Sequence, residues 1–505
     1  MDDFSPQNQR GTMNSQSPTP IADTPLLEKG TNRFSKYYEK VNHIPVIKTR
    51  GRVKDVVGLA IVSEGPVCNY GDMCRIDIAG GKSIDAEVVG FNSNDVILMP
   101  IGALEGITHG CEVYSSAQPL SIICADQLLG RVLNGVGRPL DGSTLDFYAP
   151  PTPVLRETTN PLLRRRVTEP IATGVRAIDG TLTAGKGQRM AIMSGTGVGK
   201  STLLSMIARN TEADVTVIAL VGERRREVLD FLERDLGPEG LKRSVVVVAT
   251  SDDPPMVRLR AAFVATTIAE YFRDSGRDVM FLLDSLTRLA YAQREIGLSA
   301  GEPPTTRGYP PSVFNLLPKL LERTGNSDRG TMTAFYNVLV EGDDLDEPIT
   351  DAVRGIVDGH IVLSRDLANS GHYPAIDVPA SISRLAIEVT TERHTQAAQR
   401  LKGLYAQYNS VKELILIGGY VKGSSPEVDE AIRLKPRMDA FLKQGIFETA
   451  PFDTSKRGLL SLFLSREEVD DEMKGAGEGE SASPDTASSD NITEAVADES
   501  GQIVL

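Results

Sequence analysis

Residues 194–201 decide the fold of this chain, and they read Ser194-Gly195-Thr196-Gly197-Val198-Gly199-Lys200-Ser201. An apolar run (190–193) precedes them, and a helical pattern from Thr202 to Arg209 follows. A strand, a glycine-rich turn and a helix N-terminus in this order aim several backbone N–H groups at one point, where a polyphosphate binds. The strict phosphate-loop pattern has Gly in place of Ser194, but serine is small enough to keep the turn. The stretch therefore predicts a nucleotide-binding α/β domain.

The side chains of this loop have predicted roles in holding ATP and Mg²⁺. Lys200 would reach the β- and γ-phosphates, and the Ser201 hydroxyl would coordinate Mg²⁺. The remaining phosphate-binding positions are Ser194, Gly195, Thr196, Gly197, Val198, Gly199 and Thr202.

Two further carboxylates end apolar runs of the kind that form buried parallel strands. The run 279–283 ends at Asp284, and the run 215–221 is followed by Gly222 and Glu223. Ligands bind at the carboxyl ends of strands in open α/β sheets, so Asp284 is placed to hold the Mg²⁺ shell. Glu223 is a candidate for orienting the attacking water. Spacing alone also allows a solvated strand end for Asp284 and a surface position for Glu223.

Several motifs resemble those of the catalytic subunits of rotary F-type ATPases. They are residues 129–135, 169–179, 222–224 and 373–377. The type III protein-export ATPases resemble this chain more closely still. That resemblance is carried by residues 292–298, 301–304, 307–314, 341–344 and 358–365, and it covers residues 46–465 in all. Within this family, the runs 292–297 and 381–384 look more like the flagellar branch than the virulence-injectisome branch.

The resemblance implies roles for three residues. Glu223 matches the family's catalytic glutamate, Tyr373 matches the aromatic residue that packs on the adenine ring, and Arg384 matches the arginine finger supplied by a neighbouring subunit. The chemistry fits, because a planar and permanently charged guanidinium suits developing phosphoryl charge. Without the resemblance, Tyr373 would be a core or loop tyrosine and Arg384 a surface arginine. For Arg224 the sequence leaves a γ-phosphate contact and a structural ion pair equally open.

The composition is typical of a large cytosolic enzyme. The chain has 505 residues, of which 40% are hydrophobic, and its four cysteines have neither CxxC nor zinc spacing, so we expect them to be reduced and structural. The acidic start (1–4) lacks the basic region of a signal peptide, and no apolar run approaches membrane-spanning length. Residues 467–505 hold twelve Asp or Glu and one Lys, hence −11 of the formal charge of −14. No basic stripe is present, which weighs against nucleic acid as a partner.

The predicted fold class is α/β: a RecA/F1-like P-loop ATPase core with a small N-terminal β-barrel and a C-terminal helical domain. Glycine-separated alternating segments predict the barrel, and apolar strands alternating with helical patterns predict the core. The predicted regions are a flexible N-terminal segment (1–45), the β-barrel (46–119), the P-loop ATPase domain (120–386), the helical domain (387–465) and a disordered acidic tail (466–505).

The leading hypothesis is a homohexameric Mg²⁺-dependent ATPase, in the cytoplasm and peripheral to the bacterial inner membrane, that energises flagellar protein export. As partners, the resemblance implies export-apparatus stalk and regulator proteins, export substrates and their chaperones. A virulence-injectisome ATPase is the first alternative. A hexameric nucleic-acid translocase would need a basic groove, whereas residues 341–347 are acidic. A scaffold that binds but does not hydrolyse ATP is disfavoured by Lys200, Glu223 and Asp284 together.

Overall fold

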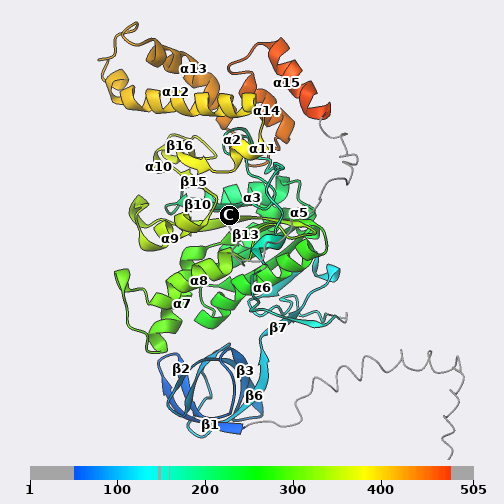
Figure 1. The fold of residues 1–505 in the computed structure, drawn as a ribbon. Helices are drawn as coiled ribbons and strands as arrows, with labels where there is room; N and C mark the ends of the chain where they lie inside the picture. The colour runs from blue at the N-terminus through cyan, green and yellow to red at the C-terminus, as the bar shows by residue number, and fades with distance from the viewer. Residues whose placement is uncertain (1–49, 146–148, 159, 479–505) are drawn as a thin grey trace, which may run out of the picture. The chain divides into compact units, whose positions relative to one another are not determined.

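The computed structural model describes residues 50–145, 149–158 and 160–478. The predicted flexible segment 1–45 and residues 479–505 of the predicted tail lie outside these ranges. The N-terminal part of the described chain is a closed barrel with strand order β1-β2-β5-β4-β3-β6 (Figure 1). Inward side chains such as Ile61, Ile76 and Leu98 are fully buried in its core. Its strands are β1 (Arg50–Val57), β2 (Ala60–Glu64), β3 (Asp72–Ile78), β4 (Lys82–Asn92), β5 (Asp95–Pro100) and β6 (Glu112–Pro119).

An eight-stranded sheet with the order β16-β15-β10-β14-β13-β11-β12-β8 forms the framework of the α/β core. Its strands are parallel apart from β16, which pairs antiparallel with β15. The strands are β8 (Val132–Asn134), β10 (Arg189–Ser194), β11 (Val215–Glu223), β12 (Ser244–Thr250), β13 (Asp278–Asp284), β14 (Thr331–Leu339), β15 (Gly359–Leu363) and β16 (Ile376–Ser383). A separate small sheet joins β7 (Ser121–Ile123) to β9 (Pro151–Pro153).

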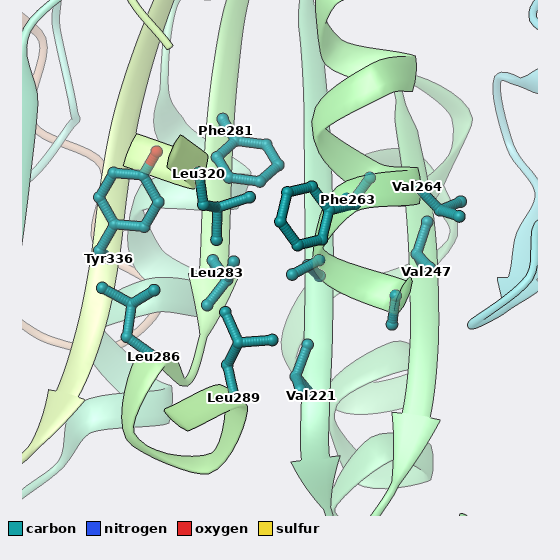
Figure 2. Packing of buried hydrophobic residues seen from close by; sticks show 14 of the residues in the cluster. Val221, Val247, Phe263, Val264, Phe281, Leu283, Leu286, Leu289, Leu320 and Tyr336 are labelled. Atoms are coloured by element: carbon teal, nitrogen blue, oxygen red, sulfur yellow. The ribbon is translucent and has the colours of Figure 1, made fainter. Parts of the chain in front are cut away.

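The central strands are continuous apolar runs because helices cover both faces of the sheet. Successive side chains of a strand point to opposite faces. In β11, Val217 and Ala219 accordingly join one hydrophobic cluster while Ile218 and Leu220 join another. Figure 2 shows the first cluster, where side chains of β11, β12, β13 and β14 meet those of three helices. These helices are α6 (Pro255–Asp274), α7 (Leu286–Ser299) and α8 (Pro311–Leu321).

The second cluster packs the opposite face of the sheet against α3 (Lys200–Asn210) and extends into the C-terminal helices. These are α12 (Glu392–Leu416), α13 (Pro426–Leu442), α14 (Phe452–Leu460) and α15 (Arg466–Glu478). The shorter α-helices are α2 (Arg176–Thr181), α4 (Arg225–Asp230), α5 (Gly237–Lys242), α9 (Pro348–Ile356), α10 (Arg365–Asn369) and α11 (Ala386–Val389). The predicted fold class is confirmed. Throughout the described ranges, every helix is too short or too polar to span a lipid bilayer.

The helix α15 corrects the prediction that residues 466–505 form a disordered tail, since residues 466–478 are folded. Val469 is buried to 2% exposure in the second cluster. The carboxylate of Glu472 lies 3.2 Å from the ammonium of Lys456, which is itself buried. The acidic composition hid this helix because its few apolar side chains fall on the face that packs against the domain.

Candidate active site

The loop between β10 and α3 has the geometry of a phosphate cradle. Gly197 and Gly199 adopt φ angles of 80° and 98°, which a side chain would strain. Gly199 directly precedes α3, so the first N–H groups of this 11-residue helix have no partner within the helix. Val198 is buried and anchors the loop, whereas Thr196 and Ser201 are exposed. The predicted loop residues thus form one turn that is open to a ligand.

Lys200 lies between the two predicted carboxylates, Asp284 and Glu223, and contacts both. Its Nζ lies 2.7 Å from Oδ1 of Asp284 and 3.5 Å from Oε1 of Glu223. Asp284 ends β13 and Glu223 ends β11, two neighbouring strands, and both residues are at most 6% exposed. Residues far apart in sequence therefore meet at one carboxyl edge of the sheet, as the strand pattern predicts.

Burial raises the pKa of Glu223 to about 7, and the negative charge of Asp284 acts in the same direction. Lys200 and Arg288 oppose this shift because their positive charges favour the carboxylate. A hydrogen bond with Glu223 lowers the pKa of Glu227. Glu223 titrates close to neutral pH, which suits proton transfer in catalysis.

Arg288 belongs to the site but was not found from the sequence. Its Nε lies 3.4 Å from Oε1 of Glu223, and its guanidinium donates a hydrogen bond to the carbonyl of Gly222. Gly222 has a φ angle of 74°, and a Cβ atom there would lie 2.8 Å from Cδ of Arg288. The available signal was its place on the helix after Asp284, one turn beyond the Ser285 cap.

Mg²⁺ fits this donor set. Ser201 presents a hydroxyl in the first turn of α3, and Asp284 supplies a buried carboxylate already paired with Lys200. Oε1 of Glu223 makes no hydrogen bond within the described ranges. Those same ranges contain no cluster of three or more His, Cys, Asp or Glu that could cage a metal. Mg²⁺ needs no such cage, because it binds through few protein oxygens together with water and phosphates.

Tyr373 lies beside the phosphate loop, as predicted for a residue that meets a base. Its ring carbons lie 3.7–3.8 Å from the position that a Cβ on Gly199 would occupy, and 47% of the residue is exposed. The C-terminal domain holds its backbone, because the Gln444 N–H donates to the Tyr373 carbonyl at 3.0 Å. Gln444 also donates to the Gly174 carbonyl at 2.8 Å and accepts from the Arg176 N–H at 2.8 Å. No sequence signal pointed to Gln444, which lies in a separate domain.

Arg384 is exposed and lies far from the phosphate loop of its own chain. Ser194 is level with Leu363 at one end of β15, whereas Ser383 pairs with Gly359 at the other end. A strand of this length spans roughly 13 Å at about 3.3 Å per residue. The fold therefore separates Arg384 from Lys200, Glu223 and Asp284 within one chain.

Arg224 and Arg225 are surface residues next to the site. Arg224 lies 3.5 Å from Glu227, and Arg225 pairs with Asp252, with both arginine side chains 77% exposed. Of the two alternatives for Arg224, the resting structure contains the ion pair.

Three family models match consecutive parts of the chain. The nucleotide-binding domain of the ATP synthase alpha/beta family matches residues 174–383, and the beta-barrel domain of that family matches residues 53–116. The T3SS EscN ATPase C-terminal domain matches residues 390–461. The matched ranges coincide with the core, the barrel and the helical domain described above.

Similar proteins come from both flagellar and injectisome systems. The flagellum-specific ATP synthase of Bacillus subtilis is 54% identical over 417 residues, which cover 82% of this chain and 95% of that protein. The assembled ATPase EscN from the type III secretion system of enteropathogenic E. coli has a TM-score of 0.78 and 43% identity, over 82% of this chain and 99% of EscN. EscN in complex with its central stalk EscO has a TM-score of 0.75 and 42% identity, with the same coverage.

Proposed function

This chain belongs to the ATP synthase alpha/beta family, in the group of flagellum-specific and type III secretion ATPases, and we propose that its ATP hydrolysis energises flagellar protein export. The observation that carries the mechanism is the meeting of Lys200, Glu223 and Asp284 at the mouth of the phosphate loop. The flagellar assignment rests on the higher identity to the flagellar relative than to EscN.

Each residue has a definite task in hydrolysis. Lys200 and the loop N–H groups bind the phosphates, while Ser201 and Asp284 hold Mg²⁺, which supplies charge neutralisation at the phosphates when bound. Glu223 orients the attacking water and accepts its proton, and Arg288 keeps the Glu223 carboxylate in place. Tyr373 packs against the adenine ring.

The active species is a ring of six copies, in which Arg384 of one copy completes the site of its neighbour. The separation of Arg384 from the phosphate loop of its own chain supports this arrangement, because the guanidinium has no route to that site within one protomer. The solved structure of EscN is that of an assembled ATPase, which is a precedent for assembly of this chain.

The partners follow from the same family. We expect a central stalk protein to bind the ring, as EscO is the central stalk of EscN. Regulator proteins, chaperones and export substrates are the further partners that we propose. We place the ATPase in the cytoplasm, at the cytoplasmic face of the bacterial inner membrane. An injectisome ATPase is the alternative, and restoration of motility in a flagellar ATPase deletion strain distinguishes the two systems.

The catalytic proposal is tested by two substitutions that separate chemistry from binding. Glu223→Gln lowers kcat by about 10²- to 10⁴-fold while nucleotide affinity persists, because the phosphate contacts come from other groups. Lys200→Ala weakens nucleotide binding as well as turnover. Steady-state kinetics and equilibrium binding of a fluorescent ATP analogue measure both. Near-normal turnover in Glu223→Gln would remove the assigned role.

A further inference from the structure

Three neighbouring strands carry polar side chains near their carboxyl ends on one face of the central sheet. Ile192, Phe335 and Leu282 all belong to the cluster on the α3 face. Side chains two positions further along a strand point to the same face. Ser194 on β10, Asn337 on β14 and Asp284 on β13 therefore point to this same face near the phosphate loop, with Ser194 two residues further along its strand because Asn337 pairs with Ile192.

Asn337 lies on the middle strand of the three and beside Asp284. Tyr336 pairs with Leu283, so the next position along the two parallel strands sets Asn337 level with Asp284. Asn337 is 0% exposed, and neither Oδ1 nor Nδ2 of its amide has a hydrogen-bond partner within the residues that the structure covers. The buried hydroxyl of Ser194 likewise has no partner there.

The same strand satisfies its two other buried polar side chains on this face, and the first of them, the Thr331 hydroxyl, donates to Oδ1 of Asp278 at 2.8 Å. Thr333, four residues before Asn337, is also fully buried. Its hydroxyl accepts a hydrogen bond from the Gly187 N–H at 2.8 Å and donates to the Gly185 carbonyl at 3.3 Å. The polar side chains that are distant from the phosphate loop are thus bonded within the protein. The amide that lies next to Asp284 is not, and buried amides with no partner call for a ligand or water.

We propose that Asn337 is a positioning residue of the ATPase reaction, whose amide links Asp284 to a water of the hydrated Mg²⁺·nucleotide. This inference rests on the proposed ATPase function. A carboxylate only accepts hydrogen bonds, so Nδ2–H donates to Asp284. A water held by a cation is a donor, so Oδ1 accepts from it. Outer-shell groups of this kind orient the groups that hold a metal and tune its affinity.

The proposal makes an unusual prediction for the protein without ligand. Removal of a buried polar group that has no partner does not destabilise a fold, whereas removal of one that is bonded does. Asn337→Leu, which has a similar volume and no hydrogen-bonding atoms, should melt at or above the wild-type temperature. Thr333→Val, on the same strand and face, should melt at a lower temperature and serves as the matched control.

The experiment compares melting temperatures of the full chain with no ligand, with ADP and EDTA, and with ADP and Mg²⁺. In Asn337→Leu the rise with ADP and EDTA should be unchanged, while the additional rise caused by Mg²⁺ should be largely lost. Its kcat should fall roughly 10- to 100-fold, as for a misplaced reacting group. Asn337→Thr keeps a donor and an acceptor without added volume, so it should recover part of both effects. Thr333→Val should retain the full Mg²⁺-dependent rise.

Two results overturn the inference. If Asn337→Leu and Asn337→Thr both lose as much stability without ligand as Thr333→Val, the amide is bonded in the resting fold and serves it structurally. If both variants keep the wild-type response to Mg²⁺ and the wild-type kcat, Asn337 takes no part in the site. Failure of the wild type itself to bind or hydrolyse Mg²⁺·ATP would instead contradict the proposed function.

Discussion

At Glu223, the burial that suits the carboxylate to its proposed catalytic role also acts against the stability of the resting fold. The residue is 6% exposed, and burial raises its pKa from 4.5 to about 7. The folded protein therefore binds this proton more tightly than the unfolded chain does. By linkage, the contribution of Glu223 to stability is greatest below pH 4.5, decreases as the pH rises towards 7, and is constant above it.

The first prediction follows from this linkage. Because glutamine carries no charge, Glu223→Gln should be more stable than the wild type at pH 8, by on the order of 2 kcal/mol, and close to it at pH 5. Urea unfolding of the ligand-free protein at the two pH values measures the difference. An advantage of the variant that is equal at both pH values would show that ionisation of Glu223 does not strain the fold.

The second prediction concerns Gly222, which controls where Arg288 lies. Gly222→Ala would strain a backbone at φ 74° and place a methyl group 2.8 Å from the Arg288 side chain. The expected result is a kcat at least tenfold lower with little change in KM, because the displaced arginine no longer holds Glu223. Gly276→Ala, at φ 89° but with no atom within 4 Å of its Cβ and outside the phosphate loop, is the matched control for backbone strain. Equal losses of kcat in both variants would assign the effect to strain alone.

The sequence could predict those candidate site residues that belong to a short, contiguous sequence pattern. Lys200 lies in a contiguous motif, and Asp284 ends an apolar run, so both could be placed from strand geometry. Arg288 and Gln444 could not, because their roles depend on which loops meet in space. The unpartnered amide of Asn337 was equally hidden, because hydrogen-bond partners depend on which strands are adjacent.

At the scale of elements, α15 shows how a few contacts fix a segment whose composition predicts disorder. The helix has five acidic residues in its first seven positions, yet Val469 is buried in the domain core. Glu472 lies 3.2 Å from Lys456 and 3.8 Å from Arg393, on two different helices. Composition averages over a segment, whereas packing depends on the one face that carries the apolar side chain.

The third prediction is that truncation after Ser465 destabilises the protein. The truncation would expose the apolar surface that Val469 covers. It would also leave the buried ammonium of Lys456 without the Glu472 carboxylate. The expected loss is roughly 2–4 kcal/mol of the free energy of unfolding, from the apolar burial and the unpaired charge. A chain that ends after Glu478 keeps these contacts and is the control. Identical unfolding curves for the two truncations would show that α15 does not contribute.

At the scale of the whole molecule, the residues proposed to act in hydrolysis lie at opposite ends of the strands of one sheet. Lys200, Glu223 and Asp284 lie at the carboxyl edge of the parallel strands, whereas Arg384 lies at the opposite edge. The antiparallel pairing of β16 with β15 causes this separation, because it reverses the chain direction just before Arg384. The sequence resemblance implied a finger acting between subunits, and the strand register provides a physical reason for it.

The central claim, that the active site is completed by a second copy, predicts complementation between two inactive variants. Arg384→Ala should bind ATP but hydrolyse it about 10³-fold or more slowly, as loss of an arginine finger does. Lys200→Ala lacks the phosphate-binding lysine but retains Arg384.

Mixing the two proteins creates interfaces that pair an intact phosphate loop with an intact Arg384. The decisive measurement is the ATPase rate of this mixture at a protein concentration where labelled subunits are seen to share hexamers. Recovery of a substantial fraction of wild-type turnover is the predicted result. A mixture that stays inactive although mixed hexamers form would contradict the account.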